Sequence, residues 1–292
     1  MRPLTFIVEA ADDGRTLKRL LLSRVRLSEG AMRRLKFQDG ILLDGVPAHV
    51  ARCVRAGQTV TLLLPGDDPG MTVRLPEALC VRYEDAHLLV VDKPAPLPTL
   101  PSVHQSGETL ESRVRAYYGD PPGFLFRPVS RLDKGTSGLL VCARGAHEQK
   151  LLSERLHTDA FVREYLAVVV GRPPHERGVV DAPIARAPGE TVRRCVAAEG
   201  KPARTHYALL HAHGDFSLLR LRLQTGRTHQ IRVHMASLGC PVAGDFLYGR
   251  EDARLPGRFA LHSARVSLLH PLTGARLDIS SPLPEALAAL MR

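Results

Sequence analysis

Apolar residues along the first 65 positions recur at the intervals of helices and strands. The residues with the spacing of one helix face, which predicts an amphipathic helix, are Leu17, Leu20 and Leu21. Ser28 is a suitable cap for a second short helix, with Met32 and Leu35 as its apolar contacts. Asp44-Gly45 lies between two extended runs and predicts a hairpin. The alternating apolar residues of a closing strand are Val60, Leu62 and Leu64.

Residues 66–70 are rich in chain breakers and separate this pattern from a longer series of elements. Strands are expected within residues 81–91, 139–142, 163–170, 206–213 and 216–223. Helices are expected over residues 109–118, 147–156 and 282–291. The last two strands meet at Gly214-Asp215, which is another hairpin signal, whereas residues 173–203 predict mainly loops.

Length and charge narrow the class of protein. A length of 292 residues is typical of a protein with about two domains. Its hydrophobic content of 44% is sufficient for ordinary cores and excludes a disordered chain. The 40 basic and 30 acidic residues leave a formal charge of +10, which favours polyanionic partners, nucleic acid first. With 5% aromatic residues and no Trp, a broad base-stacking platform is not expected.

Cysteine usage indicates a reducing compartment. The five cysteines are Cys53, Cys80, Cys142, Cys195 and Cys240. They lie far apart without paired spacing, which disfavours a zinc site or a disulfide framework. The N-terminus lacks an apolar signal core, and no stretch has the length of a membrane span. We therefore expect a cytoplasmic protein that does not enter a membrane.

Residues 127–141 have the layout of a loop that leads into a buried strand. Asp133 is the only acid in this stretch and lies between Arg131 and Lys134. Gly135 and Gly138 allow positive φ, as tight loops often require. Opposite charge lowers the pKa of a carboxylate, and an ionised carboxylate is suited to act as a nucleophile. The alternative, which is the commoner meaning of a bare Arg-Leu-Asp, is a surface ion pair in a turn.

Residues 224–235, which read QTGRTHQIRVHM, form the second stretch that could carry chemistry. Ile231 and Met235 share one helical face with Leu238, so Arg232 is expected off that buried face. His229 and His234 do not have the i, i+4 spacing of a helical zinc pair, and no carboxylate or cysteine completes a ligand set. No metal site is therefore expected.

The two stretches together resemble the RluA family of RNA pseudouridine synthases. In the family motif, His-Arg-Leu-Asp and two variable residues precede Thr-Ser-Gly-Leu; residues 131–133 and 136–139 match it, and Ser130 replaces the histidine. Residues 225–234 match the family's Thr-Gly-Arg, Ser or Thr, then His-Gln-Ile-Arg-Val-His. Residues 244–249 and 261–263 continue the family pattern and are interpreted as structural support. The resemblance extends from about residue 81 to the C-terminus.

The resemblance implies an isomerase that converts uridine in RNA to pseudouridine without a cofactor. Asp133 would attack either the ribose or the uracil ring; both remain open. The basic partner of Asp133 would be Arg232, with Arg227 as second choice. Tyr165 would lie beside the uracil, although a strand tyrosine alone more often indicates core packing. Arg131 would fill the space that the flipped base leaves. The further motif residues expected to contact RNA are Thr136, Arg227, His229 and Gln230.

The implied fold is α+β, with a mixed, mostly antiparallel sheet and a central cleft in residues 81–292. Residues 1–65 resemble an S-four-type RNA-binding domain, a small α/β unit joined by a linker at 66–80. Its expected RNA contacts are Arg33, Arg34 and Lys36, although a basic solvated helix pair is the alternative interpretation. Residues 173–203 carry Arg186 and Lys201 and form either an RNA-contacting excursion or a solvated loop.

We expect a monomer that acts on ribosomal or transfer RNA, and the sequence leaves the target uridine open. Two other classes of protein remain. One is a catalytically silent, ribosome-associated RNA-binding protein, against which an intact Asp133, Tyr165 and Arg232 argue. The other is a glycosidase, which needs two cooperating carboxylates, and the sequence offers no convincing second one.

Overall fold

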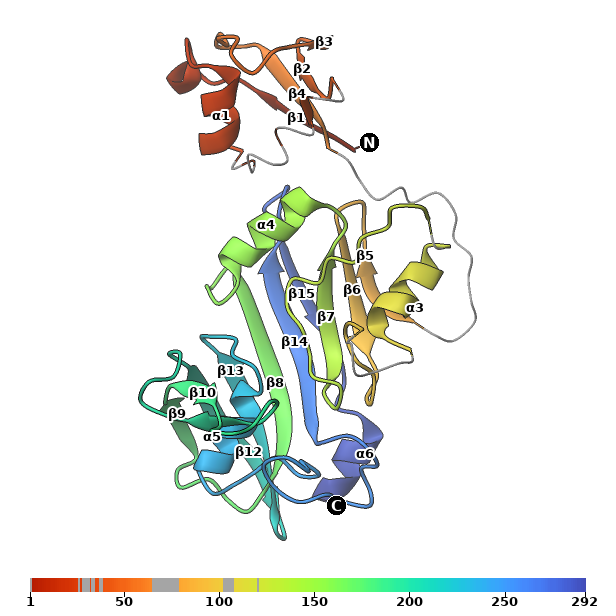
Figure 1. Ribbon diagram of the computed structural model, residues 1–292, viewed down its shortest axis with the longest axis vertical. Coiled ribbons are helices and arrows are strands. Elements are labelled where there is room, and N and C mark those ends of the chain that lie inside the picture. Colours follow the sequence, from red (N-terminus) through yellow and green to blue (C-terminus); the bar gives the residue numbers. More distant parts are fainter. Residues whose placement is uncertain are drawn as a thin grey trace.

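The computed structural model describes residues 2–25, 27, 32, 35–36, 39–64, 79–101, 108–119 and 121–292. The described residues form two main sheets (Figure 1). The sheet before residues 65–78 is antiparallel, and the larger sheet after them is mixed. The expected cap Ser28, the expected RNA contacts Arg33 and Arg34, and nearly all of the expected linker lie outside the described residues.

The N-terminal sheet has four antiparallel strands in the order β1-β4-β2-β3. The strands are β1 (Arg2–Ile7), β2 (Ile41–Leu43), β3 (Val46–Pro47) and β4 (Thr59–Leu64). The predicted hairpin joins β2 to β3, and Asp44 (φ 52°) and Gly45 (φ 80°) both take the positive φ of a tight primed turn. β4 lies where the alternating residues predict it. The sequence pattern missed β1.

Helix α1 (Leu17–Ser23) covers this sheet, as the leucine spacing predicts, and a 3-10 turn (Ala10–Asp12) precedes it. Thr16 caps α1 by accepting a hydrogen bond from the amide of Arg19 (3.3 Å). Leu17, Leu20 and Leu21 are fully buried. The apolar cluster to which they belong contains only residues between 8 and 62, so this unit has a core of its own.

The second sheet has nine strands in the order β5-β6-β7-β14-β8-β13-β12-β9, with β15 paired to β14 (Figure 1). Only the β7–β14 pair is parallel. The strands are β5 (Cys80–Glu84), β6 (Leu88–Lys93), β7 (Ser137–Ala143), β8 (Phe161–Val170), β9 (Arg177–Asp181), β12 (Arg204–His213), β13 (Phe216–Leu223), β14 (Leu261–Leu269) and β15 (Arg276–Ser280). The architecture is the predicted α+β fold with a mixed, mostly antiparallel sheet.

Both faces of this sheet are covered, which explains the continuous apolar runs of its central strands. Leu140 and Cys142 of β7 point into a core shared with helices α3, α5 and α6. Leu139 and Val141 point to the opposite face, where Leu152 of α4 packs. The helices are α3 (Leu110–Tyr117), α4 (Ala146–Arg155), α5 (Gln230–Ser237) and α6 (Glu285–Ala288). Within the described ranges, no helix has both the length and the hydropathy to cross a membrane.

Three segments differ from the sequence-based expectation. Residues 81–91 hold two strands, because Asp85 accepts the amides of His87 and Leu88 (both 2.7 Å) and closes a short turn. The expected loop 173–203 contains β9 and a small hairpin of β10 (Ile184–Arg186) and β11 (Arg194–Val196). The C-terminal helix is only α6 followed by a 3-10 turn (Ala289–Met291).

Candidate active site

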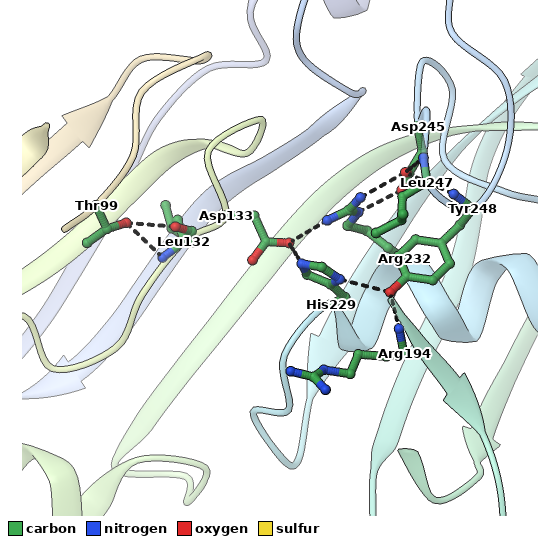
Figure 2. A network of polar contacts seen from close by, with 9 residues as sticks. All are labelled: Thr99, Leu132, Asp133, Arg194, His229, Arg232, Asp245, Leu247 and Tyr248. Carbon is green, nitrogen blue, oxygen red and sulfur yellow. Dashed lines mark hydrogen bonds and ion pairs between the residues drawn. The ribbon is translucent and has the colours of Figure 1, made fainter. Parts of the chain in front are cut away.

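The backbone on both sides of Asp133 is held by hydrogen bonds from another loop. The hydroxyl of Thr99 donates to the carbonyl of Leu132 (2.7 Å) and accepts from its amide (3.3 Å) (Figure 2). The carbonyl of Lys134 accepts from the amide of Leu97 (3.0 Å). The loop that carries Asp133 is thereby fixed to residues 97–99, far away in the sequence.

Lys93, at the end of β6, joins the same two loops. Its side chain is fully buried, and Nζ donates to the carbonyls of Leu97 (2.7 Å), Pro94 (3.0 Å) and Lys134 (3.4 Å). Burial lowers the pKa of Lys93 to about 7, and the negative charge of Asp133 acts in the opposite direction. In the sequence, Lys93-Pro94 ends a strand and resembles the opening of the family's catalytic domain, but nothing indicated that Lys93 supports the loop of Asp133.

The two glycines of the loop are needed for different reasons. Gly138 has φ 105°, and a Cβ atom there would lie 2.3 Å from the carbonyl oxygen of Ser263. Gly135, in contrast, does not have positive φ; a Cβ atom there would lie 2.6 Å from the ring of Phe259. The expectation of positive φ was therefore right for Gly138 and wrong for Gly135, which is needed for close packing.

Arg232 of α5 is the cation in contact with Asp133. Its Nη1 donates to Oδ2 of Asp133 (3.1 Å), while Nε and Nη2 form a bidentate pair with Asp245 (2.7 and 2.9 Å) (Figure 2). The guanidinium also lies over the rings of Phe259 (4.2 Å) and Tyr248 (5.0 Å). Of the two arginines that the sequence left open, Arg227 does not contact Asp133: its Nε donates to the carbonyl of Pro202 (2.9 Å).

Arg232 is buried, at 3% exposure, although it lies off the face formed by Ile231 and Met235. The reason is Asp245, which is fully buried and also accepts the amides of Leu247 (3.0 Å) and Tyr248 (3.2 Å). Burial opposes the charge on Arg232, but the hydrogen bonds and charge of Asp245, followed by those of Asp133, raise its pKa. Asp245 was interpreted as structural support; its acidity within a family-like segment was the available signal.

The cations beside Asp133 in the sequence are not its partners in space. Arg131 and Lys134 are both exposed, and within the described residues neither forms an ion pair with Asp133. The pairing cation instead comes from α5, 99 residues further along the chain. The neighbouring cations Arg131 and Lys134 are therefore not the ion-pair partners of Asp133, and Arg232 is.

His229 also faces Asp133, and it was expected only to contact RNA. Its Nε2 lies 3.9 Å from Oδ2 of Asp133, and its Nδ1 is 2.8 Å from the hydroxyl of Tyr248 (Figure 2). His229 precedes the first turn of α5 with φ 59°, a conformation that L-residues other than glycine seldom adopt. Burial lowers the pKa of His229, Arg232 acts in the same direction, and Asp133 opposes them.

The other predicted site residues have different surroundings. Tyr165 of β8 is buried in the main core and lines the cleft beside Asp133. Gln230 is buried and its amide group makes four hydrogen bonds within the protein, to Thr225, Arg227, Arg204 and Thr205. The side chain of Gln230 therefore stabilises the turn before α5, and its contact with RNA stays a prediction. Thr136 is buried at the cleft wall, and Lys36 is exposed on the N-terminal unit.

These residues surround an open cleft of about 810 Å³. Its acidic, basic and histidine lining residues are Arg131, Asp133, Lys134, His157, Arg163, Arg227, His229 and Arg232. Asp133 is the only acid among the described residues that line it. In the described part of the chain, no group of three or more His, Cys, Asp or Glu side chains could hold a metal ion. A basic cleft with a single carboxylate suits chemistry on a polyanion.

The fold and the cleft thus suit an enzyme that acts on a polyanion, and comparison with known proteins identifies which one. A family profile described as RNA pseudouridylate synthase matches residues 87–237. Several relatives more than 30% identical match about nine-tenths of the chain. The chain belongs to the RluA family of RNA pseudouridine synthases, which are isomerases.

Two relatives and one solved structure illustrate the match. An uncharacterized RNA pseudouridine synthase of Chloroflexus aurantiacus is 41% identical over 270 residues, 91% of this chain and 85% of the relative. The ribosomal large subunit pseudouridine synthase D of Xanthomonas campestris is 40% identical, over 92% of this chain and 84% of the relative. Human RNA Pseudouridylate Synthase Domain Containing 1 has a TM-score of 0.57 at 27% identity, covering 75% of this chain and 90% of that one.

Proposed function

We propose that Asp133 is the catalytic carboxylate of this pseudouridine synthase. The observation that carries the proposal is that Asp133 is the only acidic residue among the described residues that line the cleft. Arg232 donates to its Oδ2, whereas no described residue donates a hydrogen bond to Oδ1. One oxygen is thus held in place and the other is available to a substrate.

The reaction is an isomerisation, so every bond that breaks or forms permanently lies within the substrate. The glycosidic bond between C1′ of the ribose and N1 of the uracil breaks, the uracil rotates, and a bond forms between C1′ and C5. C5 loses its proton and N1 gains one, so no oxidant or group donor is consumed. Asp133 would attack C1′ or the uracil ring, and both routes need a negatively charged carboxylate near the flipped base.

Other cleft residues have proposed roles around that carboxylate. Arg232 would orient Asp133 through its hydrogen bond to Oδ2. Tyr165 would pack against the uracil and assist removal of the C5 proton. Arg131, exposed at the cleft, would stack in the space that the flipped nucleotide leaves, and Arg227 would contact the RNA backbone.

The proposed substrate is ribosomal RNA of the large subunit. The support is the printed function of the relatives from Xanthomonas campestris and Nitrosomonas europaea, which are 40% and 38% identical and are both named ribosomal large subunit pseudouridine synthase D. Transfer RNA is the second candidate. We propose that the enzyme is monomeric and acts in the cytoplasm, where such RNA substrates are found.

We propose that residues 1–65 form an S-four-type RNA-binding domain, that 66–80 are a linker and that 81–292 form the catalytic domain. The support is that the N-terminal unit has its own sheet and its own apolar core. It exposes several cations, among them Lys18, Arg19 and Lys36, which can contact phosphates.

The decisive experiment is Asp133→Asn, which keeps the size of the side chain and removes its charge. Turnover should fall to background while thermal stability and RNA affinity are retained. Asp159→Asn is a matched control, because Asp159 is a solvent-exposed acid with 95% of its side chain accessible. Pseudouridine formation by a clean Asp133→Asn preparation would refute the role, and parallel loss of RNA binding would indicate a structural ion pair instead.

The substrate proposal has a separate test. Pseudouridines would be mapped in total RNA from cells with and without the protein. Cells without it would then receive either the wild-type protein or Asp133→Asn, and the mapping would be repeated. Sites that disappear from large-subunit ribosomal RNA and return only with wild type would support both proposals. Sites that disappear only from transfer RNA would replace the proposed substrate with the second candidate.

A further inference from the structure

The contacts of Asp133 are unevenly distributed between its two oxygens. Nη1 of Arg232 is 3.1 Å from Oδ2 and Nε2 of His229 is 3.9 Å from the same atom. Arg232 is shared, since its other two donors form the bidentate pair with Asp245. One buried arginine therefore serves two carboxylates, and His229 is the remaining polar group that faces Asp133.

The hydrogen bonds of the Tyr248 hydroxyl favour one tautomer of His229. This hydroxyl accepts a hydrogen bond from the amide of Arg194 (2.9 Å), so its own proton is available for Nδ1 of His229 (2.8 Å). If Nδ1 instead carried a proton, the tyrosine would accept twice and its own proton would have no partner among the described residues. The arrangement selects the tautomer with the proton on Nε2.

The carboxylate of Asp133 selects the same tautomer. An ionised carboxylate has only acceptors, so it attracts an N–H group and repels a nitrogen lone pair. Burial, Arg232 and Arg194 all disfavour a second proton on the ring and lower the pKa of His229, against Asp133 and Asp245. Two independent neighbours, Tyr248 and Asp133, thus favour a neutral ring with Nε2–H directed at the carboxylate (Figure 2).

We propose that His229 is a positioning residue: its Nε2–H, oriented by Tyr248, donates to Oδ2 of Asp133 in the RNA complex, holds this oxygen together with Arg232 and leaves Oδ1 to react. This inference rests on the proposed catalytic role of Asp133. The 3.9 Å separation exceeds a hydrogen bond, but catalytic hydrogen bonds often shorten only when substrate is bound. The side chain of Asp133 is 30% exposed, so protein does not enclose it on all sides.

The backbone conformation of His229 agrees with this role. Its φ of 59° is costly for a residue with a Cβ atom, and such strain persists where the surrounding structure enforces it. The side chain of His229 is held by Tyr248, whose hydroxyl is in turn fixed by the backbone of β11. The β10–β11 hairpin, which the sequence pattern described only as loop, thereby contributes to the orientation of the ring beside Asp133.

The kinetic test compares His229→Gln with His229→Leu. Glutamine places an amide N–H near the position of Nε2, whereas leucine has no donor. We expect His229→Leu to lower kcat by about 10- to 100-fold with little change in KM, the size of effect typical for groups that orient catalytic residues. His229→Gln should recover most of the loss. His175→Leu, at an exposed histidine, is the control and should resemble wild type.

A spectroscopic test does not depend on activity. In protein labelled with 15N-histidine, the nitrogen shifts of His229 at pH 7 should report a neutral ring with the proton on Nε2. Tyr248→Phe should produce a mixture of tautomers. A wild-type ring with its proton on Nδ1, or a doubly protonated ring, would overturn the proposal even if His229→Leu does not fold.

The two proposals fail in different ways. If Asp133→Asn is inactive while His229→Leu keeps the wild-type kcat, the positioning role of His229 is wrong and the role of Asp133 stands. If Asp133→Asn is active, the catalytic proposal is wrong, and the inference about His229 is overturned with it. A rise in KM without a change in kcat for His229→Leu would assign His229 to RNA contact only.

Discussion

The catalytic cleft and the N-terminal unit hold their charged side chains in different ways. Around the cleft, Arg232 is almost completely buried, and Asp245 and Lys93 are fully buried. In the N-terminal unit, Lys18, Arg19 and Lys36 are exposed. A buried charge must be paired and its geometry is unique, whereas an exposed cation is mobile and screened by salt.

This difference indicates how each region uses its charge. The role proposed for Asp133 needs a donor with a fixed position, which the Asp133–Arg232–Asp245 arrangement provides. Contacting phosphates of a long polyanion needs many cations that act nearly independently. Single substitutions should therefore have large effects in the cleft and small, additive effects in the N-terminal unit.

The largest effect is expected for Arg232→Ala. Removing the donor to Asp133 and the partner of Asp245 should lower turnover by about 10²- to 10³-fold, measured as pseudouridine formed in a single turnover. Arg227→Ala is the matched control, since it removes an arginine of the same motif that does not contact Asp133; it should mainly weaken RNA binding. The reverse ranking of the two variants would assign the partner role to Arg227.

Asp245→Asn should have the next largest effect and should act on stability as well. It leaves the buried guanidinium of Arg232 with a neutral partner, and breaking a buried ion pair typically costs about 3–5 kcal/mol. We expect a decrease of about 3 kcal/mol in the free energy of unfolding in urea. Asp278→Asn breaks the exposed pair with Arg265 and should change it by less than about 1 kcal/mol. Equal decreases in the free energy of unfolding for Asp245→Asn and Asp278→Asn would contradict the distinction between buried and exposed charges.

Lys93 provides a pH-dependent test of the buried charges. Its pKa is about 7 in the folded protein against 10.5 for an ordinary lysine, so between these values the unfolded chain binds more protons. Stability due to Lys93 must therefore rise with pH across this window. The free energy of unfolding of wild type, relative to Lys93→Met, should increase by at most about 1.4 kcal/mol per pH unit between pH 7.5 and 9.5.

The exposed lysine of α1 supplies the control for that measurement. The free energy of unfolding of wild type would be compared with that of Lys18→Met at pH 7.5 and 9.5. This difference should not change with pH, because Lys18 is exposed. A difference for Lys93→Met that does not change with pH would mean that the buried ammonium of Lys93 keeps its proton throughout. In that case the three carbonyl acceptors, and not burial, would dominate its protonation.

The smallest effect is expected for the N-terminal unit. Removing residues 1–65 should weaken binding of structured RNA about tenfold and flatten the dependence of log K on log salt, by about 0.7–0.9 for each phosphate that these residues neutralise. The chemical step on a short bound substrate should survive. Salt titrations of both proteins would show this, and an unchanged slope with unchanged affinity would exclude a role of residues 1–65 in RNA binding.

Periodicity and local chemistry were enough to predict much of the fold. The leucine spacing of α1, the turn at Asp44-Gly45 and the apolar run of β7 each depend on neighbours a few residues away, and all three elements lie where the pattern predicts. The two motifs around Asp133 and Arg232 indicated the family and the class of reaction. The strand β1 was missed, because its partner β4 lies at the other end of the unit.

Which groups surround Asp133 was decided only by the tertiary structure. Arg232 reaches it across 99 residues, and Lys93 reaches the carbonyl of Lys134 across 41. The adjacent cations Arg131 and Lys134 are exposed. Asp245 and Tyr248, which the sequence indicated only as structural support, instead contact Arg232 and His229. The physical reason is that a residue's sequence neighbours determine backbone conformation, whereas burial and electrostatic partners depend on how distant strands and loops pack together.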